Sequence, residues 1–323
     1  MNSCIDNFVS KSNKFKNFLK MYNTLFHKVI ARTLGRYPEI FSKNFKVLFS
    51  KYIYYVCTGK YLNLKNPKNI SEKIMWLKLY YKNPLIPRCT DKYLVREYIE
   101  NKGLSHILNE LYGVFDSVDD INFKELPNQF VLKATHGCGY NIICKDKNTL
   151  NITETKQKLK AWMNSVYGLR SGEWHYSEIA PKIICERYLD HLDTSSSIID
   201  YKITCFNGRP YCFLIIYDRT EKTAKLSSYN LQWQRINFLK IEGSDVPPPQ
   251  NLAIMIQIAS VLANPFPYVR VDFYEIEGRL YFGELTFTPL GGMQHTYKDE
   301  TLDLMGEQLV LPKKNRTRMP FLS

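Results

Sequence analysis

The strongest constraint on this chain comes from residues 269–292, where charged residues interrupt two segments that otherwise resemble buried strands. Residues 269–275 alternate apolar and polar side chains and are rich in β-branched and aromatic types, and residues 280–288 resume the pattern. Glu277 and Gly278 supply a turn between the two segments. The sequence therefore predicts a β-hairpin.

Four polar side chains share one face of this predicted hairpin. Successive strand residues point to opposite faces, so Arg270 and Asp272 share a side of the first strand. Glu284 and Thr286 do the same on the second strand. Burying two carboxylates without a counter-charge would cost on the order of several kcal/mol, so either Arg270 neutralises them as a structural ion pair or a divalent cation does. Mg²⁺ fits because it takes oxygen ligands from one or two carboxylates and from substrate phosphates.

Composition describes a globular chain with an uneven charge. Of the 323 residues 45% are hydrophobic, which is enough for a substantial core and two or more packed lobes. The formal net charge is +13, and residues 1–60 hold eleven Lys or Arg residues against two acidic ones, an excess of +9. Such a segment suits an anionic membrane, a polyanionic glycan or nucleic acid, and a solvated helical face is the plain alternative.

The cysteines and the first residues bear on the cellular compartment. Eight cysteines are scattered without a C-x-x-C pair, so we expect reduced thiols. The first ten residues lack an apolar core behind a charged start, and no run approaches the roughly 18 apolar residues that span a bilayer. The sequence predicts a cytoplasmic protein.

Helices are expected first, and alternating strands and helices later. Residues 8–60 carry apolar side chains at helical spacing. A further helix opens at residues 69–72 with Ser71 as its N-cap, and another covers residues 92–101 behind Thr90 or Asp91. Strands are expected at residues 130–133, 142–144, 183–188, 200–206 and 210–217, and helices at residues 153–166 and 252–263, the last one buried. After Gly306 we expect a basic, poorly ordered tail.

A glycine-containing loop at residues 136–141 lies between two predicted strands. This position excludes a P-loop or a Rossmann turn, because both aim phosphates at a helix N-terminus. The bare backbone N–H groups at Gly137 and Gly139 suit a loop that folds over phosphates, with Lys133 entering beside it. An ordinary tight hairpin is the alternative, and His136 alone is more often a loop hydrogen-bonder than a catalyst.

Two further signals are weak when taken singly. Asp200 and Lys202 share a strand face, where the lysine suits either a γ-phosphate or a surface ion pair. Residues 186–189 end an apolar strand, and backbone groups at such an end can pair with the edge of an adenine ring.

Together and in this order, the elements resemble the nucleotide site of the ATP-grasp superfamily. More narrowly, they resemble the TupA-like ATP-grasp family, whose members are associated with bacterial capsule, O-antigen and teichuronopeptide biosynthesis. The resemblance runs from about residue 69 to residue 292. The segments that carry it include K-A-T-H-G-C-G-Y-N (133–141), D-Y-K-I-T-C-F-N-G (200–208) and R-V-D-F-Y (270–274) followed by G-E-L-T-F-T-P (283–289).

The resemblance implies an α+β fold in which two α/β lobes clamp the nucleotide behind a helical N-terminal extension. The predicted divisions are a basic helical extension (1–68), an N-terminal lobe (69–128), a Gly-loop subdomain (129–190), a C-terminal subdomain with the Mg²⁺ site (191–306) and a basic tail (307–323).

The resemblance also implies roles for individual residues. The nucleotide would be bound by Lys92 and Lys133 at the α- and β-phosphates, by the loop residues His136, Gly137, Gly139 and Asn141, by Glu186, Arg187, Tyr188 and Leu189 at the adenine, and by Lys202 at the γ-phosphate. Asp272 and Glu284 would hold Mg²⁺, and Arg270 would act with Lys202 on the reacting groups. Thr286 stands where many ATP-grasp enzymes have Asn, and a hydroxyl is a poorer metal ligand, which leaves one or two Mg²⁺ ions open.

The implied reaction is that of a carboxylate–amine ligase. A substrate carboxylate attacks the γ-phosphorus of ATP, and an amine then displaces phosphate to leave an amide. The implied carboxylate is a uronic acid of a surface glycan or its precursor, the amine is an amino acid or amino alcohol, and no nucleic acid is expected. Residues 1–60 are expected to allow peripheral contact with the inner face of the cytoplasmic membrane.

Three other functions stay open at this point. A glycosyltransferase would be expected to carry a D-x-D motif, and none stands out in the sequence. A kinase-like phosphotransferase would use the same nucleotide residues without forming an amide. An anchoring protein is suggested by the basic N-terminal residues.

Replacing Asp272 or Glu284 by its amide is expected to leave the fold equally or slightly more stable, because a like-charged pair is relieved.

Overall fold

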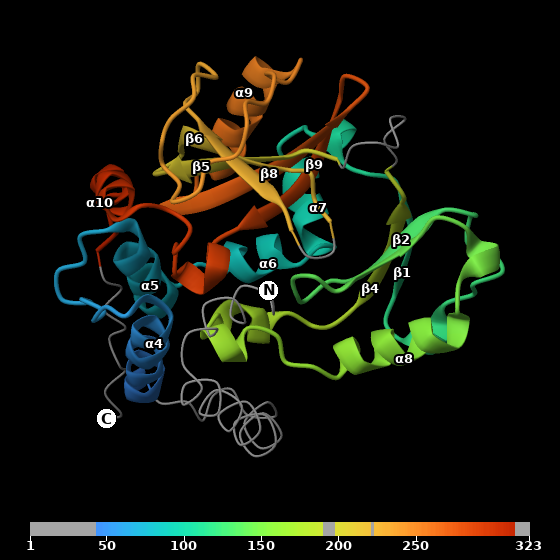
Figure 1. The fold of residues 1–323 in the computed structure, drawn as a ribbon. Helices are drawn as coiled ribbons and strands as arrows, with labels where there is room; N and C mark the ends of the chain where they lie inside the picture. Colours follow the sequence, from blue (N-terminus) through green and yellow to red (C-terminus); the bar gives the residue numbers. More distant parts are fainter. Residues whose placement is uncertain (1–42, 190–197, 221–222, 314–323) are drawn as a thin grey trace.

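The computed structural model describes residues 43–189, 198–220 and 223–313, and within them the chain forms two antiparallel sheets (Figure 1). The first sheet has the strand order β1-β4-β2-β3, with β1 (Leu111–Phe115), β2 (Phe130–Ala134), β3 (Asn141–Cys144) and β4 (Ile183–Arg187). The second has the order β7-β6-β5-β8-β9, with β5 (Asp200–Phe206), β6 (Arg209–Tyr217), β7 (Lys225–Tyr229), β8 (Tyr268–Ile276) and β9 (Arg279–Thr286). The helices are α4 (Lys43–Thr58), α5 (Ile70–Tyr80), α6 (Leu85–Thr90), α7 (Leu94–Glu100), α8 (Ile152–Met163), α9 (Leu252–Ala263) and α10 (Asp299–Gln308). The expected α+β class is confirmed.

Helix α8 covers one face of the first sheet. Its Leu159 is fully buried in one cluster with Phe130 and Leu132 of β2. Because strand side chains alternate, Lys133 on β2 points to the opposite face. Glu186 of β4 shares that face, since it lies beside Val131 in the pairing of the two strands.

Helix α9 covers one face of the second sheet in the same way. Its Met255 is fully buried in a cluster with Ile203 of β5 and Val271 of β8. Alternation therefore turns Lys202 and Asp272 to the other face. The predicted hairpins on either side of this pairing are both present, as β5–β6 and β8–β9.

A third cluster closes one end of that other face. Helices α4, α5 and α10 gather at the left of Figure 1, beside the second sheet. Phe49 of α4 and Ile74 of α5 are buried with Phe206 of β5 and Tyr268 of β8. Phe206 and Tyr268 pair across the strands at the end of the sheet face that carries Lys202, so apolar packing fixes where the charged part of this face ends.

Three local expectations need correction. The N-cap of α5 is Asn69, whose side chain accepts a hydrogen bond from Glu72 N, whereas the Ser71 hydroxyl accepts one from Gln294 N. Helix α9 is buried on one face only, because Ile254 and Val261 are exposed. The expected tail is ordered at its start, since α10 ends at Gln308 and Leu309 is fully buried, and residues 314–323 lie outside the described residues.

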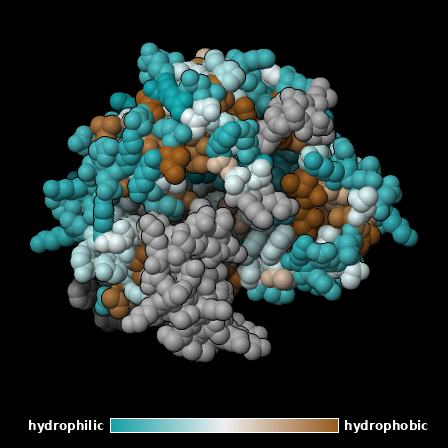
Figure 2. All heavy atoms as spheres, viewed as in Figure 1, coloured by the Kyte–Doolittle hydropathy of each residue, from teal (hydrophilic) through white to brown (hydrophobic). Residues whose placement is uncertain are grey.

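No helix in the described ranges is long and apolar enough to cross a membrane. The seven cysteines among those residues form no disulfide, and Cys4 lies outside the described residues. The expected helices within residues 8–42 also lie outside them. On the face in Figure 2, apolar side chains appear as separate patches among hydrophilic ones.

Candidate functional site

Pairing of β5, β8 and β9 arranges the predicted site residues in parallel rows on one sheet face. One row, called here the carboxylate row, contains Lys202, Asp272 and Glu284 on three neighbouring strands. The next row, called the arginine row, contains Thr204, Arg270 and Thr286. The strand pairing therefore brings together the residues predicted for phosphate transfer and metal binding.

Asp272 is the most heavily paired group of the carboxylate row. It is 2% exposed, and its Oδ1 accepts a hydrogen bond of 2.7 Å from Arg270 Nε. Its Oδ2 lies 2.6 Å from Arg270 Nη2 and 2.5 Å from Lys202 Nζ. Burial would lower the pKa of Arg270, but Asp272 raises it, so the guanidinium stays charged. Of the two ways to neutralise the carboxylates, the ion pair is therefore built into the protein.

Glu284 differs from Asp272 because its carboxylate is less occupied. Burial alone would raise the pKa of Glu284, but Lys202, Arg270 and Lys92 lower it to about 2, so it is ionised at neutral pH. Its Oε1 accepts a hydrogen bond of 2.9 Å from the hydroxyl of Thr286 and lies 3.4 Å from Arg270 Nη2.

The glycine loop between β2 and β3 faces this row. Lys92 donates to the carbonyl oxygen of Gly137, and burial lowers the pKa of Lys92 while Glu284 raises it. A side chain at Gly137 would place its Cβ 2.7 Å from the ring of Tyr140, so the loop packs closely on that ring. Gly139 is exposed at the tip, where the loop has room above it.

Two predicted members of the loop lie in other positions. His136 is 2% exposed, and its Nε2 donates to the carbonyl oxygen of Trp162 over 3.0 Å. Burial lowers the pKa of His136, so it supports the loop as a neutral ring. Asn141 begins β3 as an exposed residue opposite Lys133. Within the described residues, neither side chain forms a hydrogen bond to the carboxylate row.

Lys133 lies on the face of the first sheet opposite α8 and forms an ion pair with Glu186. Its Nζ is 2.6 Å from Glu186 Oε2, and Arg96 Nη1 is 3.4 Å from Oε1 of the same carboxylate. Arg96 also donates to the carbonyl oxygen of Asn109 over 2.9 Å. The side chain of Glu186 therefore holds Lys133 in position, in addition to any role of the Glu186 backbone.

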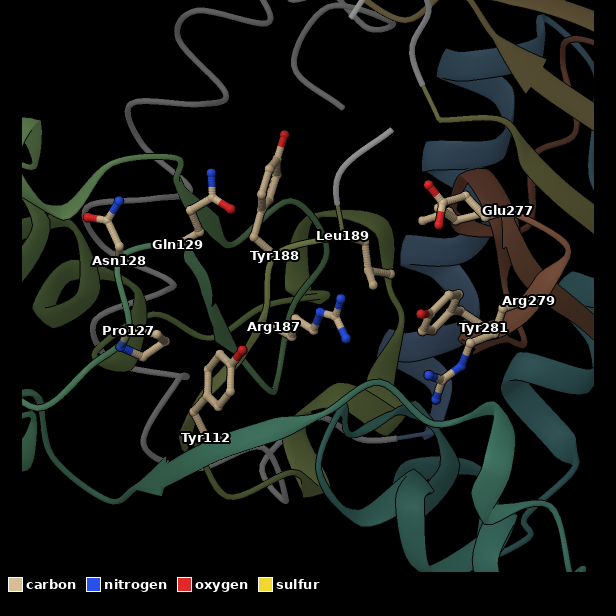
Figure 3. A pocket seen from close by; sticks show the side chains of 11 residues that line it. Tyr112, Pro127, Asn128, Gln129, Arg187, Tyr188, Leu189, Glu277, Arg279 and Tyr281 are labelled. Carbon is tan, nitrogen blue, oxygen red and sulfur yellow. The ribbon is translucent and has the colours of Figure 1, made fainter. Parts of the chain in front are cut away.

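A pocket of about 680 Å³ is lined by residues from the first sheet and its loops and from the β8–β9 hairpin (Figure 3). Three residues predicted to meet adenine, Arg187, Tyr188 and Leu189, line it on one side. The turn of the β8–β9 hairpin lines the other side with Ile276, Glu277, Arg279 and Tyr281, and Tyr112 and residues 127–129 complete the wall. Because a strand rises about 3.3 Å per residue, this hairpin turn is roughly 13 Å from the carboxylate row. The arginine row lies on the other side of the carboxylate row, away from the pocket.

The donor set fits a divalent cation that binds with a phosphate ligand. Among the described residues there is no group of three or more His, Cys, Asp or Glu side chains that could hold a metal ion alone. The carboxylate row offers two carboxylates, and Thr286 adds a hydroxyl. Hard oxygen ligands of this number suit Mg²⁺ when substrate phosphates complete its coordination.

Sequence reasoning missed several residues of this region. The sequence predicts that Asp200 shares the strand face of Lys202, but it gives Asp200 no role. Arg96 follows Lys92 by four residues on a predicted helix, and this spacing signals neighbouring side chains. Arg279 and Tyr281 were missed for a different reason. A β-bulge at Gly283 shifts the register, so that Asp272 pairs with Glu284 but Phe273 pairs with Phe282, and simple alternation fails there.

Solved ligase structures resemble this one at low identity. For a D-alanine–D-alanine ligase from Bacillus anthracis complexed with ATP, identity is 15% and the TM-score 0.43, over 73% of this chain and 63% of that one. For an L-amino acid ligase from Bacillus licheniformis, identity is 13% and the TM-score 0.38, over 63% of this chain and 42% of that one. For the ATP-grasp ligase PsnB complexed with a minimal precursor, identity is 12% and the TM-score 0.35, over 67% of this chain and 57% of that one. The chain thus spans less than two thirds of each of these ligases, and at these scores the likeness assigns it no activity.

Sequence comparison gives a sharper result. A comparison with curated proteins returned no match. The family model described as TupA-like ATPgrasp matches residues 72–310, which is 239 of the 323 residues. This range includes every residue predicted for the nucleotide and metal sites. The chain belongs to the TupA-like ATP-grasp family.

Proposed function

We propose that this protein is an ATP- and Mg²⁺-dependent ligase that joins a carboxylate to an amine and forms ADP. The observation that carries the proposal is the carboxylate row, in which Lys202, Asp272 and Glu284 align across three strands opposite Lys92 and the glycine loop. Two carboxylates among converging cations suit a metal-bound triphosphate.

The separation between the pocket and the carboxylate row supports one orientation of the nucleotide. Adenine occupies the pocket beside Tyr188 and Leu189, and the triphosphate extends over the roughly 13 Å to the carboxylate row. The γ-phosphate then lies beside Lys202. Beyond it, Arg270 of the arginine row meets the carboxylate that is to be phosphorylated.

Each charged side chain has a separate task in this reaction. Lys92 and Lys133 hold the inner phosphates, and Lys202 meets the charge that develops on the transferring phosphoryl group. Mg²⁺, when bound at Asp272 and Glu284, supplies further positive charge for the phosphate oxygens. Arg270 orients the substrate carboxylate for attack on the γ-phosphorus.

The second half of the reaction needs no nucleophile from the protein. The amine attacks the carbonyl carbon of the acylphosphate, phosphate leaves and an amide remains. The glycine loop covers the phosphates during these steps, and its packing on Tyr140 supports an ordered cover that excludes water.

We further propose that the carboxylate belongs to a uronic acid of a surface glycan or its precursor and that the amine is an amino acid or amino alcohol. The association of this family with capsule, O-antigen and teichuronopeptide biosynthesis supports this choice. The proposed location is the cytoplasm, with peripheral contact at the inner face of the membrane through the basic residues 1–60.

An ADP-release assay with panels of uronic acids and amines tests the proposal. We expect ADP only when Mg²⁺, a carboxylate and an amine are all present, together with a product whose mass equals the two substrates less one water. ADP with a phosphorylated product and no amide would favour a phosphotransferase. No ATP turnover with any pair would contradict the proposal.

A further inference from the structure

Asp272 cannot bind a divalent cation through its Oδ2 in the arrangement seen here without losing a partner. Both of its carboxylate oxygens already accept from cationic side chains, Oδ1 from Arg270 and Oδ2 from both Arg270 and Lys202. At 2% exposure no solvent-facing side of the carboxylate remains. Because Oδ2 already accepts two hydrogen bonds, one of the two cations must move when a metal binds this oxygen.

Lys202 is the cation that is free to move. Arg270 is held at both oxygens of Asp272, and its Nη2 also donates to the Thr286 hydroxyl over 3.1 Å and lies 3.4 Å from Glu284. Lys202 has one close contact, 2.5 Å to Asp272. An ammonium on a flexible stem also changes position more readily than a bidentate guanidinium.

Asp200 offers Lys202 a second position. It lies two residues earlier on β5, so its side chain shares the face of Lys202, and its Oδ2 is already 3.7 Å from Lys202 Nζ. Asp200 is 7% exposed, and Arg219 pairs with it from the end of β6. The Arg219 side chain is 54% exposed, and a carboxylate can accept from two cations at once, so Asp200 can keep this pair while it also receives Lys202.

We propose that Asp200 is a positioning residue that receives the ammonium of Lys202 when a divalent cation takes Asp272. This inference rests on the proposed Mg²⁺- and ATP-dependent function. Lys202 is 7% exposed, and a buried ammonium without a carboxylate partner is strongly disfavoured. With Asp200 present, the lysine keeps a counter-charge while the metal site forms, and it stays within the rows that face the triphosphate.

Direct binding of Mn²⁺ in the presence of a non-hydrolysable ATP analogue, measured from the free ion by electron paramagnetic resonance, tests this exchange without relying on activity. We expect Asp200→Asn to bind Mn²⁺ about tenfold more weakly than wild type, since breaking a buried ion pair is costly. Asp200→Glu keeps an acceptor and should stay within about twofold. Asp218→Asn makes the same change at a surface pair with Lys225 on the same sheet and should leave binding unchanged.

A second background separates exchange from simple loss of charge. Lys202→Met removes the lysine that has to be moved, so it should bind Mn²⁺ more tightly than wild type. Adding Asp200→Asn to it should then change Mn²⁺ affinity little. If Asp200→Asn weakens Mn²⁺ binding equally in both backgrounds, Asp200 acts only through its charge and the inference is wrong.

Failure of the inference differs from failure of the proposed function. Mn²⁺ binding that is lost in Asp272→Asn but unaffected by Asp200→Asn overturns the role of Asp200 alone. Absence of any Asp272-dependent Mn²⁺ binding, even with a non-hydrolysable ATP analogue present, overturns the proposed function and this inference with it. Thermal unfolding of each variant shows whether it is folded, and Asp200→Glu remains informative if Asp200→Asn is not.

Discussion

Single charged residues decide whether the carboxylate row can bind a metal–nucleotide complex. Asp272→Asn and Glu284→Gln each remove one anionic oxygen ligand, and we expect either change to abolish ATP turnover. ADP release measures this. Asp218→Asn and Glu154→Gln make the same changes in surface ion pairs and should keep wild-type rates. Full activity in both site variants would contradict the metal assignment.

The pKa of Glu284 reverses the sequence-based expectation for stability. Its folded value of about 2 is below its ordinary 4.5, so the ionised group stabilises the fold above about pH 4.5, and this contribution is lost as the pH falls toward 2. Removing the charge leaves Lys202, Arg270 and Lys92 less compensated. We therefore expect Glu284→Gln to lower the thermal midpoint at pH 7.

The pH dependence provides the check on that prediction. The gap in thermal midpoint between wild type and Glu284→Gln should narrow as the pH is lowered from 4.5, and the 40% exposure of the Glu284 side chain limits its size. A variant that is equally stable or more stable than wild type at pH 7 would restore the original expectation of a relieved like-charged pair.

At the scale of elements, the glycine loop depends on close packing against aromatic rings. A methyl group at residue 137 would lie 2.7 Å from the ring of Tyr140 and 3.0 Å from that of Tyr167, so the loop must shift. We expect Gly137→Ala to raise KM for ATP with little change in thermal stability. Tyr140→Phe keeps the ring and should behave as wild type, although it loses the hydrogen bond to Ser165. An unchanged KM in Gly137→Ala would show that the loop does not contact nucleotide.

The sequence predicted elements well where one rule acted alone. Strict alternation placed Arg270 and Asp272 on one face, and Asn207-Gly208 marked the β5–β6 turn. Prediction failed where tertiary contacts decided the outcome. Asn69 caps α5, and the hydroxyl of Ser71 instead accepts a hydrogen bond from the backbone N–H of Gln294, which is distant in the sequence. The hydrogen bond that His136 donates to Trp162 of α8 agrees with the reading of a loop hydrogen-bonder, and its contact with nucleotide stays a prediction.

At the scale of the whole molecule, helix α4 belongs to the core. Phe49, Ile53 and Tyr54 are buried in the cluster that includes residues of α5 and α10, so this part of the basic region is not a solvated face. Deleting residues 1–60 removes all three side chains, and burial of each large apolar side chain contributes about 2 kcal/mol. We expect a markedly lower thermal midpoint or insoluble protein. Deletion of residues 1–42 leaves α4 in place and is the matched comparison for the loss of these three side chains.

The shorter deletion is also the right test of membrane contact. Residues 1–42 hold seven basic and two acidic residues. Intact protein should bind liposomes rich in anionic lipid at low salt and release them near about 0.5 M salt, where screening is strong. The protein without residues 1–42 should bind weakly at any salt. Equal binding by both proteins, or binding that salt does not affect, would contradict the proposal.

The route of one oxygen atom tests the central claim most directly. The carboxylate that supports ADP release is prepared with ¹⁸O in both oxygens, and the phosphate released with the amide is analysed by mass spectrometry. Attack of the carboxylate on the γ-phosphorus, with Arg270 and Lys202 holding the reacting groups, predicts one ¹⁸O atom per released phosphate and ADP as the nucleotide product. Phosphate without ¹⁸O, or label in AMP, would contradict an acylphosphate route.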